Sequence, residues 1–242
     1  MGIMHRFANP TRFLKIANAV LPWTGGLTVL LLGAGLYLAL LNSPPDYQQG
    51  ETVRIMYVHV PSAWMALFVY LTMAVASAVA LIWRHPLADI SAKAAAPIGA
   101  GFTIICLATG SLWGKPMWGT WWVWDARLTS MLILLFLYLG YIALVNAFDD
   151  PNRGYRAAGI LALVGVVNLP VIKFSVDWWN TLHQPASVVR LDGPAIHPDI
   201  LLPLIVMALA FKLFFVTVLI LRIRSEIAAA KIRNLQLSLA RG

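Results

Sequence analysis

Long apolar runs alternate with short polar segments along the whole chain, in a pattern typical of membrane-spanning helices. Six runs lie at about residues 21–41, 60–83, 92–112, 128–148, 157–176 and 200–221. Each is long enough to cross a hydrocarbon core of about 30 Å at about 1.5 Å per helical residue. The pattern predicts an all-α polytopic membrane protein, in which residues 1–242 form a single domain of six transmembrane helices.

Composition points to the same class. Of the 242 residues, 60% are hydrophobic and 12% are charged, which gives more apolar surface than a soluble domain of this size can cover. Pro97, Pro170 and Pro203 fall inside or near the ends of predicted helices, where neighbouring helices can satisfy the freed carbonyls. We expect the step Asn168-Leu169-Pro170 to kink the fifth helix. The first run lacks a small-residue cleavage site, so it is expected to be retained as a helix.

Basic residues divide unequally between the two predicted sides of the membrane. Twelve lie at the termini and around the loops after the second and fourth helices: Arg6, Arg12, Lys15, Arg84, Lys93, Arg153, Arg156, Arg222, Arg224, Lys231, Arg233 and Arg241. Four lie in the other three loops: Arg54, Lys115, Arg127 and Arg190. The positive-inside rule then predicts that both termini are cytoplasmic. The net charge of +8 is explained by this topology and by anionic lipid headgroups, and does not indicate nucleic-acid binding.

The outer loops are longer than the cytoplasmic ones and hold most of the tryptophan. They cover residues 42–59, 113–127 and 177–199, and five of the ten Trp residues lie between Trp113 and Trp124. Indole rings stack well on flat apolar ligands, and haem is such a ligand. An aromatic belt at the membrane interface is the alternative. A belt should populate both faces, whereas eight of the ten Trp lie on the predicted outer side, which favours a binding surface.

Histidine introduces metal chemistry, because neutral imidazole is a good ligand for haem iron. Of the five histidines, His5 and His85 are predicted to be cytoplasmic, and His59, His183 and His197 to be on the outer side. A single outer His is also compatible with a polar residue at the interface. His59 and His183 form the better pair of ligands, since each has aromatic neighbours. These neighbours are Tyr57, Trp64, Trp178 and Trp179.

Other outer residues have two interpretations each. Four cations are candidates for pairing with the haem propionates: Lys115, Arg127, Arg54 and Arg190. Asp125 lies at the expected start of the fourth helix, where it either caps the helix or has a polar role at the haem edge. Two lysines lie within apolar runs. We expect Lys173 to snorkel to the outer interface, and Lys212 either to snorkel or to face a partner subunit or polar gap.

Several signatures are missing from the sequence. There is no Cys-x-x-Cys-His motif, so the chain is not expected to carry covalent c-type haem. The segment Gly110-Ser-Leu-Trp-Gly-Lys-Pro116 falls one residue short of a phosphate-binding loop and lacks its Ser or Thr. If ATP is used, we therefore expect another subunit to hydrolyse it. Cys106 is expected to be a buried, inert thiol.

The segment Trp118-Gly-Thr-Trp-Trp-Val-Trp-Asp-Ala-Arg127 closely resembles the WWD domain of haem-handling membrane proteins, in particular the haem exporter protein C family of bacterial cytochrome c maturation. The resemblance extends to the following segments: Pro44-x-Asp-Tyr-Gln-Gln-Gly50, Val58-His-Val-Pro61, Asn168-Leu-Pro170 and Trp178-Trp-Asn-Thr-Leu-His-Gln184. It implies a bacterial inner-membrane location with the WWD loop facing the periplasm. It also implies that His59 and His183 are the axial haem ligands.

The resemblance further implies the partners and the reaction class. These partners are an ABC-type ATPase subunit, a second membrane subunit, a small single-helix subunit and a periplasmic haem chaperone. The predicted function is to hold non-covalent haem b on the Trp loop, with Trp113, Trp118, Trp121, Trp122, Trp124 and Asp125 as its platform, and to pass it to the chaperone. No catalytic residue is predicted. The alternatives are a permease that moves haem through its helices and a membrane redox protein of b-cytochrome type.

Overall fold

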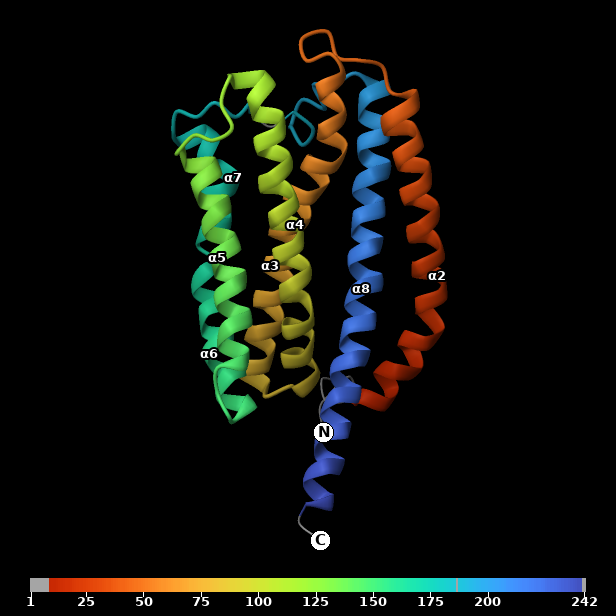
Figure 1. Ribbon diagram of the computed structural model, residues 1–242, viewed down its shortest axis with the longest axis vertical. Coiled ribbons are helices and arrows are strands. Elements are labelled where there is room, and N and C mark those ends of the chain that lie inside the picture. The colour runs from red at the N-terminus through yellow and green to blue at the C-terminus, as the bar shows by residue number, and fades with distance from the viewer. Residues whose placement is uncertain (1–8, 186, 241–242) are drawn as a thin grey trace.

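The computed structural model describes residues 9–185 and 187–240, and within them the protein is entirely helical (Figure 1). Six segments are long and apolar enough to span a membrane, and their bounds are Pro10–Asn42, Glu51–Trp83, Pro86–Trp118, Ala126–Asn146, Pro151–Trp178 and Pro198–Leu239. The predicted fold class is confirmed. His5, Arg6 and Arg241 lie outside the described residues.

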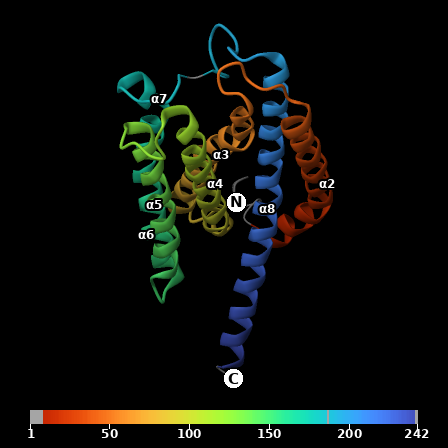
Figure 2. The same cartoon turned by 45° about the horizontal axis from the view of Figure 1, so that its top comes forward.

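The helices are, in chain order, α2 (Pro10–Tyr37), the π-helix η1 (Leu38–Asn42), the 3-10 helix η2 (Glu51–Ile55), α3 (Met56–Trp83), α4 (Pro86–Trp118), α5 (Ala126–Asn146), α6 (Pro151–Gly165), α7 (Asn168–Trp178) and α8 (Pro198–Leu239). Helix α2 packs on α8, which in turn contacts α3 and α4. Helix α5 packs between α4 and the α6–α7 pair. Residues 43–50, 119–125, 179–185 and 187–197 gather at one end of the bundle, here named the loop end (Figures 1 and 2).

Most helices extend beyond the apolar runs. Helix α8 continues from the bundle to Leu239, far past the predicted end at residue 221, and projects away from the loop end (Figure 1). An α-helix is held by hydrogen bonds within its own backbone, so it can continue through polar residues beyond the end of the apolar run. Two polar contacts join this region to α4. Lys93 pairs with Glu226 at 2.7 Å, and Nε of Arg222 donates to the carbonyl of Ala94 at 3.0 Å.

The predicted Trp loop is shorter than expected. Helix α4 continues to Trp118, so the first six residues of the predicted loop 113–127 are helical, and α5 already begins at Ala126. Gly119 ends α4, because its φ of 75° is left-handed and its N–H donates to the carbonyl of Lys115 at 3.0 Å. The true loop is therefore residues 119–125, which holds three of the five tryptophans.

The fifth span is broken into α6 and α7, as the Asn-Leu-Pro step predicted, although the break falls at Val166–Val167. Pro170 has no N–H to donate to the carbonyl four residues earlier, which belongs to Val166, and its ring excludes that carbonyl. Asn168 secures the new helix start, because its Nδ2 donates to the carbonyl of Ser130 on α5 at 2.9 Å.

The middle of the bundle is filled by tyrosines that lie against glycines. Tyr138 is fully buried, its hydroxyl donates to the carbonyl of Ala66 at 2.8 Å, and its ring occupies the space that a Cβ on Gly99 would need. Tyr70 is packed in the same way against Gly165. Small residues allow membrane helices to approach closely, which supplies packing where lipid gives no hydrophobic driving force.

Candidate functional site

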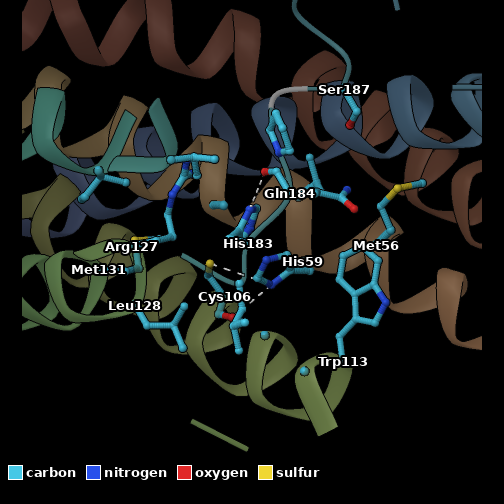
Figure 3. Close-up of a pocket in the computed structure, with 18 of the residues that line it drawn as sticks. Met56, His59, Cys106, Trp113, Arg127, Leu128, Met131, His183, Gln184 and Ser187 are labelled. Carbon is cyan, nitrogen blue, oxygen red and sulfur yellow. Dashed lines mark hydrogen bonds between the residues drawn. The ribbon is translucent and has the colours of Figure 1, made fainter. Parts of the chain in front are cut away.

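A cavity of about 290 Å³ opens at the loop end of the bundle (Figure 3). This size is near the lower limit of small-ligand sites, which span roughly 300–1,000 Å³. Its walls come from the loop before η2, the first turns of α3, the last turns of α4, the start of α5, the end of α7 and the loop before α8. Polar wall residues include Gln49, His59, Arg127, Asp177 and His183.

His59 lies in the first turns of α3, with its ring held against α4. Its Nδ1 is 3.1 Å from the carbonyl oxygen of Cys106 and 3.1 Å from Oγ1 of Thr109. A carbonyl can only accept, and Thr109 already donates to the carbonyl of Ile105 at 2.6 Å. The proton of the neutral ring is therefore on Nδ1, which leaves the lone pair of Nε2 free.

The sequence makes room for this ring. A Cβ added to Gly110 would lie 3.0 Å from Cε1 of His59, so glycine lets the imidazole rest on the α4 backbone. Cys106 is buried, as expected, with its Sγ 4.0 Å from Nδ1 of the same ring. Trp113 closes one side, with its ring centroid 5.6 Å from that of His59 in an edge-on arrangement.

His183 reaches the same cavity from the loop between α7 and α8, and Figure 3 shows it next to His59. Its Nδ1 is 2.9 Å from the carbonyl oxygen of Gln184, so this ring also carries its proton on Nδ1. The backbone N–H of His183 donates to Oγ1 of Thr181 at 2.8 Å. The centroid of its ring lies 6.3 Å from that of Trp118. Burial lowers the pKa of His183 below its ordinary value, which favours the neutral, metal-binding form.

His197, the third histidine predicted to lie on the outer side, does not line this cavity. It is the N-cap of α8, where its Nδ1 accepts from the N–H of Asp199 at 3.3 Å. Its side chain is exposed, and the carboxylate of Asp199 lies 3.6 Å away. Nδ1 of His197 is therefore an acceptor, whereas Nδ1 of His59 and of His183 is a donor.

The five tryptophans of the Trp segment separate into two groups. Trp113, Trp118 and Trp122 line the cavity, whereas Trp121 and Trp124 are 55% and 76% exposed. Trp113 is fixed by a hydrogen bond from its Nε1 to Oε1 of Gln49 at 3.0 Å. Trp118 folds back over α4, where a Cβ on Gly114 would lie 3.0 Å from its ring.

The four predicted aromatic neighbours also differ in position. Trp64 lines the cavity. Tyr57 is fully buried outside it, and its hydroxyl is hydrogen-bonded to that of Ser43. Trp178 and Trp179 are exposed at the end of α7, in contact with one another. Three of the four are thus not in the cavity wall.

Of the four candidate cations, only Arg127 lines the cavity. Its Nε donates to Oγ of Ser175 at 2.8 Å. Arg54 instead donates from Nη1 to the carbonyls of Ala39 and Leu40 at 2.9 and 2.7 Å, and so secures the end of the first span. The other two are also engaged elsewhere: Lys115 donates to the carbonyl of Gly119 at 3.0 Å, and Arg190 pairs with Asp192.

Asp125 is the N-cap of α5, as one of its two interpretations predicted. Its Oδ1 accepts from the N–H of Leu128 at 2.8 Å. Among the described residues, its buried Oδ2 has no hydrogen-bond partner, and the same is true of Nε1 of Trp122. Both atoms therefore keep an unused hydrogen-bonding capacity, Oδ2 as an acceptor and Nε1 as a donor.

Several residues in the cavity wall or directly behind it were not identified from the sequence. Gln49 and Gln184 lie within segments that carry the family resemblance, but neither was assigned a role. Thr109 and Gly110 gave no signal, because their importance depends on the helix crossing that brings α4 against His59. Lys173, interpreted from sequence as snorkelling, is part of the cavity wall.

Comparison with known proteins places the chain in a family. The family model described as Heme exporter protein C matches residues 3–238. The chain is 60% identical over 230 residues to a Heme exporter protein C of Bradyrhizobium diazoefficiens, which covers 95% of this chain and 87% of the relative. It is 50% identical over 224 residues to the Haemophilus influenzae protein of that name, covering 93% and 91% of the two chains. The corresponding Escherichia coli protein is 49% identical over 224 residues, covering 93% and 90%. The chain belongs to the Heme exporter protein C family.

Proposed function

We propose that this chain handles haem for cytochrome c maturation, by holding one non-covalent haem b in the loop-end cavity and presenting it to a haem chaperone. Nε2 of His59 and Nε2 of His183 are the axial ligands. The chain performs binding and transfer rather than catalysis. The relatives' name, Heme exporter protein C, supports the haem-handling part of this proposal.

One observation carries the assignment of the ligands. Each of the two cavity histidines donates its Nδ1 proton to a backbone carbonyl, that of Cys106 for His59 and that of Gln184 for His183. Such a hydrogen bond fixes the tautomer and the ring orientation of a metal-binding histidine. Porphyrin iron already has four nitrogen ligands, so two imidazoles complete its coordination.

The remaining wall residues fit a haem chemically. Trp118 and Trp122 supply flat apolar surface for the macrocycle. The propionates need cations and donors, and the cavity offers the guanidinium of Arg127 and the unpaired N–H of Trp122. Both lie at the loop end, where bound haem would be accessible to another protein.

The same site suggests how the chain is placed in its complex. We propose an inner-membrane location with the loop end on the periplasmic side, because basic residues gather at the opposite end. Trp121 and Trp124 face outward beside the cavity and offer a contact surface for the chaperone. An ABC-type ATPase, a second membrane subunit and a small single-helix subunit complete the assembly, and the ATPase drives release of the chaperone.

A path for haem through the middle of the bundle is not favoured. Below the cavity, the interior is occupied by buried residues of α3, α4 and α5, such as Tyr70, Phe102, Leu134 and Tyr138. Moving a macrocycle through this packed region would require the helices to separate. We therefore place the haem at the loop end only.

The direct test is purification of the chain in detergent, followed by an absorption spectrum and a pyridine haemochrome assay. We expect about one haem per chain with the six-coordinate, low-spin spectrum of two imidazole ligands. A purified, folded chain that neither retains haem nor gains this spectrum on titration with haem would refute the proposal.

A further inference from the structure

A second, shallower cavity lies below the first, on the outside of the bundle between α3 and the broken α6–α7 span. It is lined by Leu67, Phe68, Leu71, Val166, Leu169, Pro170 and Lys173. Apart from the lysine, this lining is apolar. We name this second cavity the side groove.

The side groove and the loop-end cavity share two wall residues, Leu67 and Lys173. The two spaces are therefore neighbours between α3 and α7, with these two side chains in the wall between them. Leu67 is eight residues beyond His59 on α3, which corresponds to about 12 Å along the helix. Leu71 and Phe68, farther along the groove, are 47% and 41% exposed on a face of a membrane-spanning segment. The side groove thus lies next to the loop-end cavity and is open on its outer side.

Lys173 gives this opening a specific chemistry. It lies in α7 about 7 Å from Trp178 along the helix axis. Within residues 9–185 and 187–240, its ammonium has no ion-pair or hydrogen-bond partner, although Asp177 is one turn away in the same cavity wall. Lys173 is exposed, so its ammonium is open to a charged ligand, and ionisable residues in membrane-spanning segments often mark the path of such a ligand.

We propose that haem enters the loop-end cavity sideways from the lipid leaflet next to the loop end, through the side groove, and that Lys173 binds a propionate on the way. This inference rests on the proposed haem-binding function. An apolar macrocycle matches the apolar groove, and a carboxylate matches the unpaired ammonium in the wall between the two spaces. Lys173 is then a positioning residue for the ligand, and the break at Val166–Val167 shapes one wall of its path.

The proposal is tested with the chain in lipid nanodiscs, by following the Soret band as haem reaches the two histidines. In one arm, haem is dissolved in the nanodisc lipid beforehand. In the other, it is supplied from water as a complex with serum albumin. Leu71→Trp fills the side groove, and Leu139→Trp is the matched control, because Leu139 is 45% exposed on α5 away from the groove.

We expect Leu71→Trp to slow uptake from lipid at least tenfold, with the final low-spin spectrum and haem content unchanged. Leu139→Trp should take up haem at the wild-type rate. Equal rates for the two variants would overturn the proposal, and would indicate that haem reaches the loop-end cavity by another route. Failure of the wild-type chain to form the low-spin spectrum would instead refute the haem-binding function itself.

The role of Lys173 has its own readout. Lys173→Gln should slow the uptake of haem from lipid roughly tenfold, because the propionate loses its charged partner on the way in. It should not change the uptake rate of haem dimethyl ester, whose propionates carry no charge. Lys231→Gln is the control, since it also removes one positive charge but lies on the part of α8 that projects beyond the bundle. An equal slowing for haem and its ester would contradict propionate binding by Lys173.

Discussion

The loop end carries two sets of histidines and tryptophans, and they differ in whether their side chains line the cavity. His59, His183, Trp113, Trp118 and Trp122 face the cavity. His197, Trp121, Trp124, Trp178 and Trp179 lie at the same end but do not line it. Residue type and membrane side are therefore insufficient to identify a binding residue. For two residues that face the cavity, His59 and Trp118, a glycine of α4 gives the ring space to lie against the helix.

The largest effect should come from the histidines. We expect His59→Ala and His183→Ala each to abolish the six-coordinate, low-spin spectrum, because either loss leaves the iron with one imidazole. His197→Ala should keep the wild-type spectrum, since its Nδ1 accepts from the α8 backbone instead. The measurement is the absorption spectrum of each purified variant at equal protein concentration.

Added imidazole provides the control for this comparison. It should partly restore the low-spin spectrum in His59→Ala and in His183→Ala, because a small ligand can occupy the vacated space. If His197→Ala lost the spectrum while His183→Ala retained it, the assignment of the axial ligands would be wrong.

A smaller effect should separate the tryptophans. Trp122→Ala removes an inward ring, and stacking losses of about 0.5–1.5 kcal/mol correspond to roughly a 2- to 12-fold higher Kd for haem. Trp121→Ala removes an outward ring whose neighbour is the ammonium of Lys115, 5.9 Å from its centroid. That variant should bind haem normally but transfer it to the chaperone more slowly.

Haem titrations and transfer assays with the purified chaperone distinguish the two variants. Loss of expression in both, with normal haem content per folded molecule, would support an aromatic belt. Weaker haem binding in Trp121→Ala than in Trp122→Ala would show that the cavity is not the site of stacking.

The fold was predictable because the signal for a spanning helix is long and local. All six spans were found, and even the interruption near Pro170 was expected from the chemistry of proline. The helix ends were not predicted well. Trp118 is still helical, and its position depends on Gly119, whose left-handed conformation is set by the turn that follows.

The site was only partly predictable, for a related reason. His59 and His183 were selected by their side of the membrane, their neighbours and the family resemblance, and the structure places both in one cavity. Thr109, Gly110 and Lys173 were not selected, because their roles arise from contacts between helices far apart in sequence. Arg54 was a reasonable candidate for a propionate, yet it binds carbonyls at the end of the first span.

Substitution of Gly110 offers a milder test, which asks how the ring of His59 is positioned in the cavity. Gly110→Ala places a Cβ 3.0 Å from Cε1 of His59, so the ring must shift by tenths of an ångström. We expect a several-fold higher Kd for haem and a shifted Soret maximum, with the chain still folded. Gly101→Ala is the matched control in the same helix, since a Cβ there meets nothing within 4 Å.

Both alanines favour the helix by a similar amount, so helix propensity cancels in the comparison. Titration of each variant with haem under identical detergent conditions gives the difference. Identical Kd values and spectra for the two variants would show that contact with the α4 backbone does not position His59.

The smallest expected effect concerns Asp125, whose two oxygens have different surroundings. Oδ1 caps α5 by accepting from Leu128, whereas Oδ2 has no partner among the described residues. Asp125→Ala should cost about 1 kcal/mol, as lost N-caps do, which lowers the melting temperature by about 2–4 °C. Asp125→Asn keeps a capping oxygen, so its melting temperature should match the wild type.

The two variants thereby separate capping from a role of the charge at the haem edge. If Asp125→Asn melts normally but loses haem or fails to transfer it to the chaperone, the negative charge acts at the cavity. If it melts normally and transfers haem normally, Asp125 serves only to begin α5, and the residues that face the cavity bind haem without its charge.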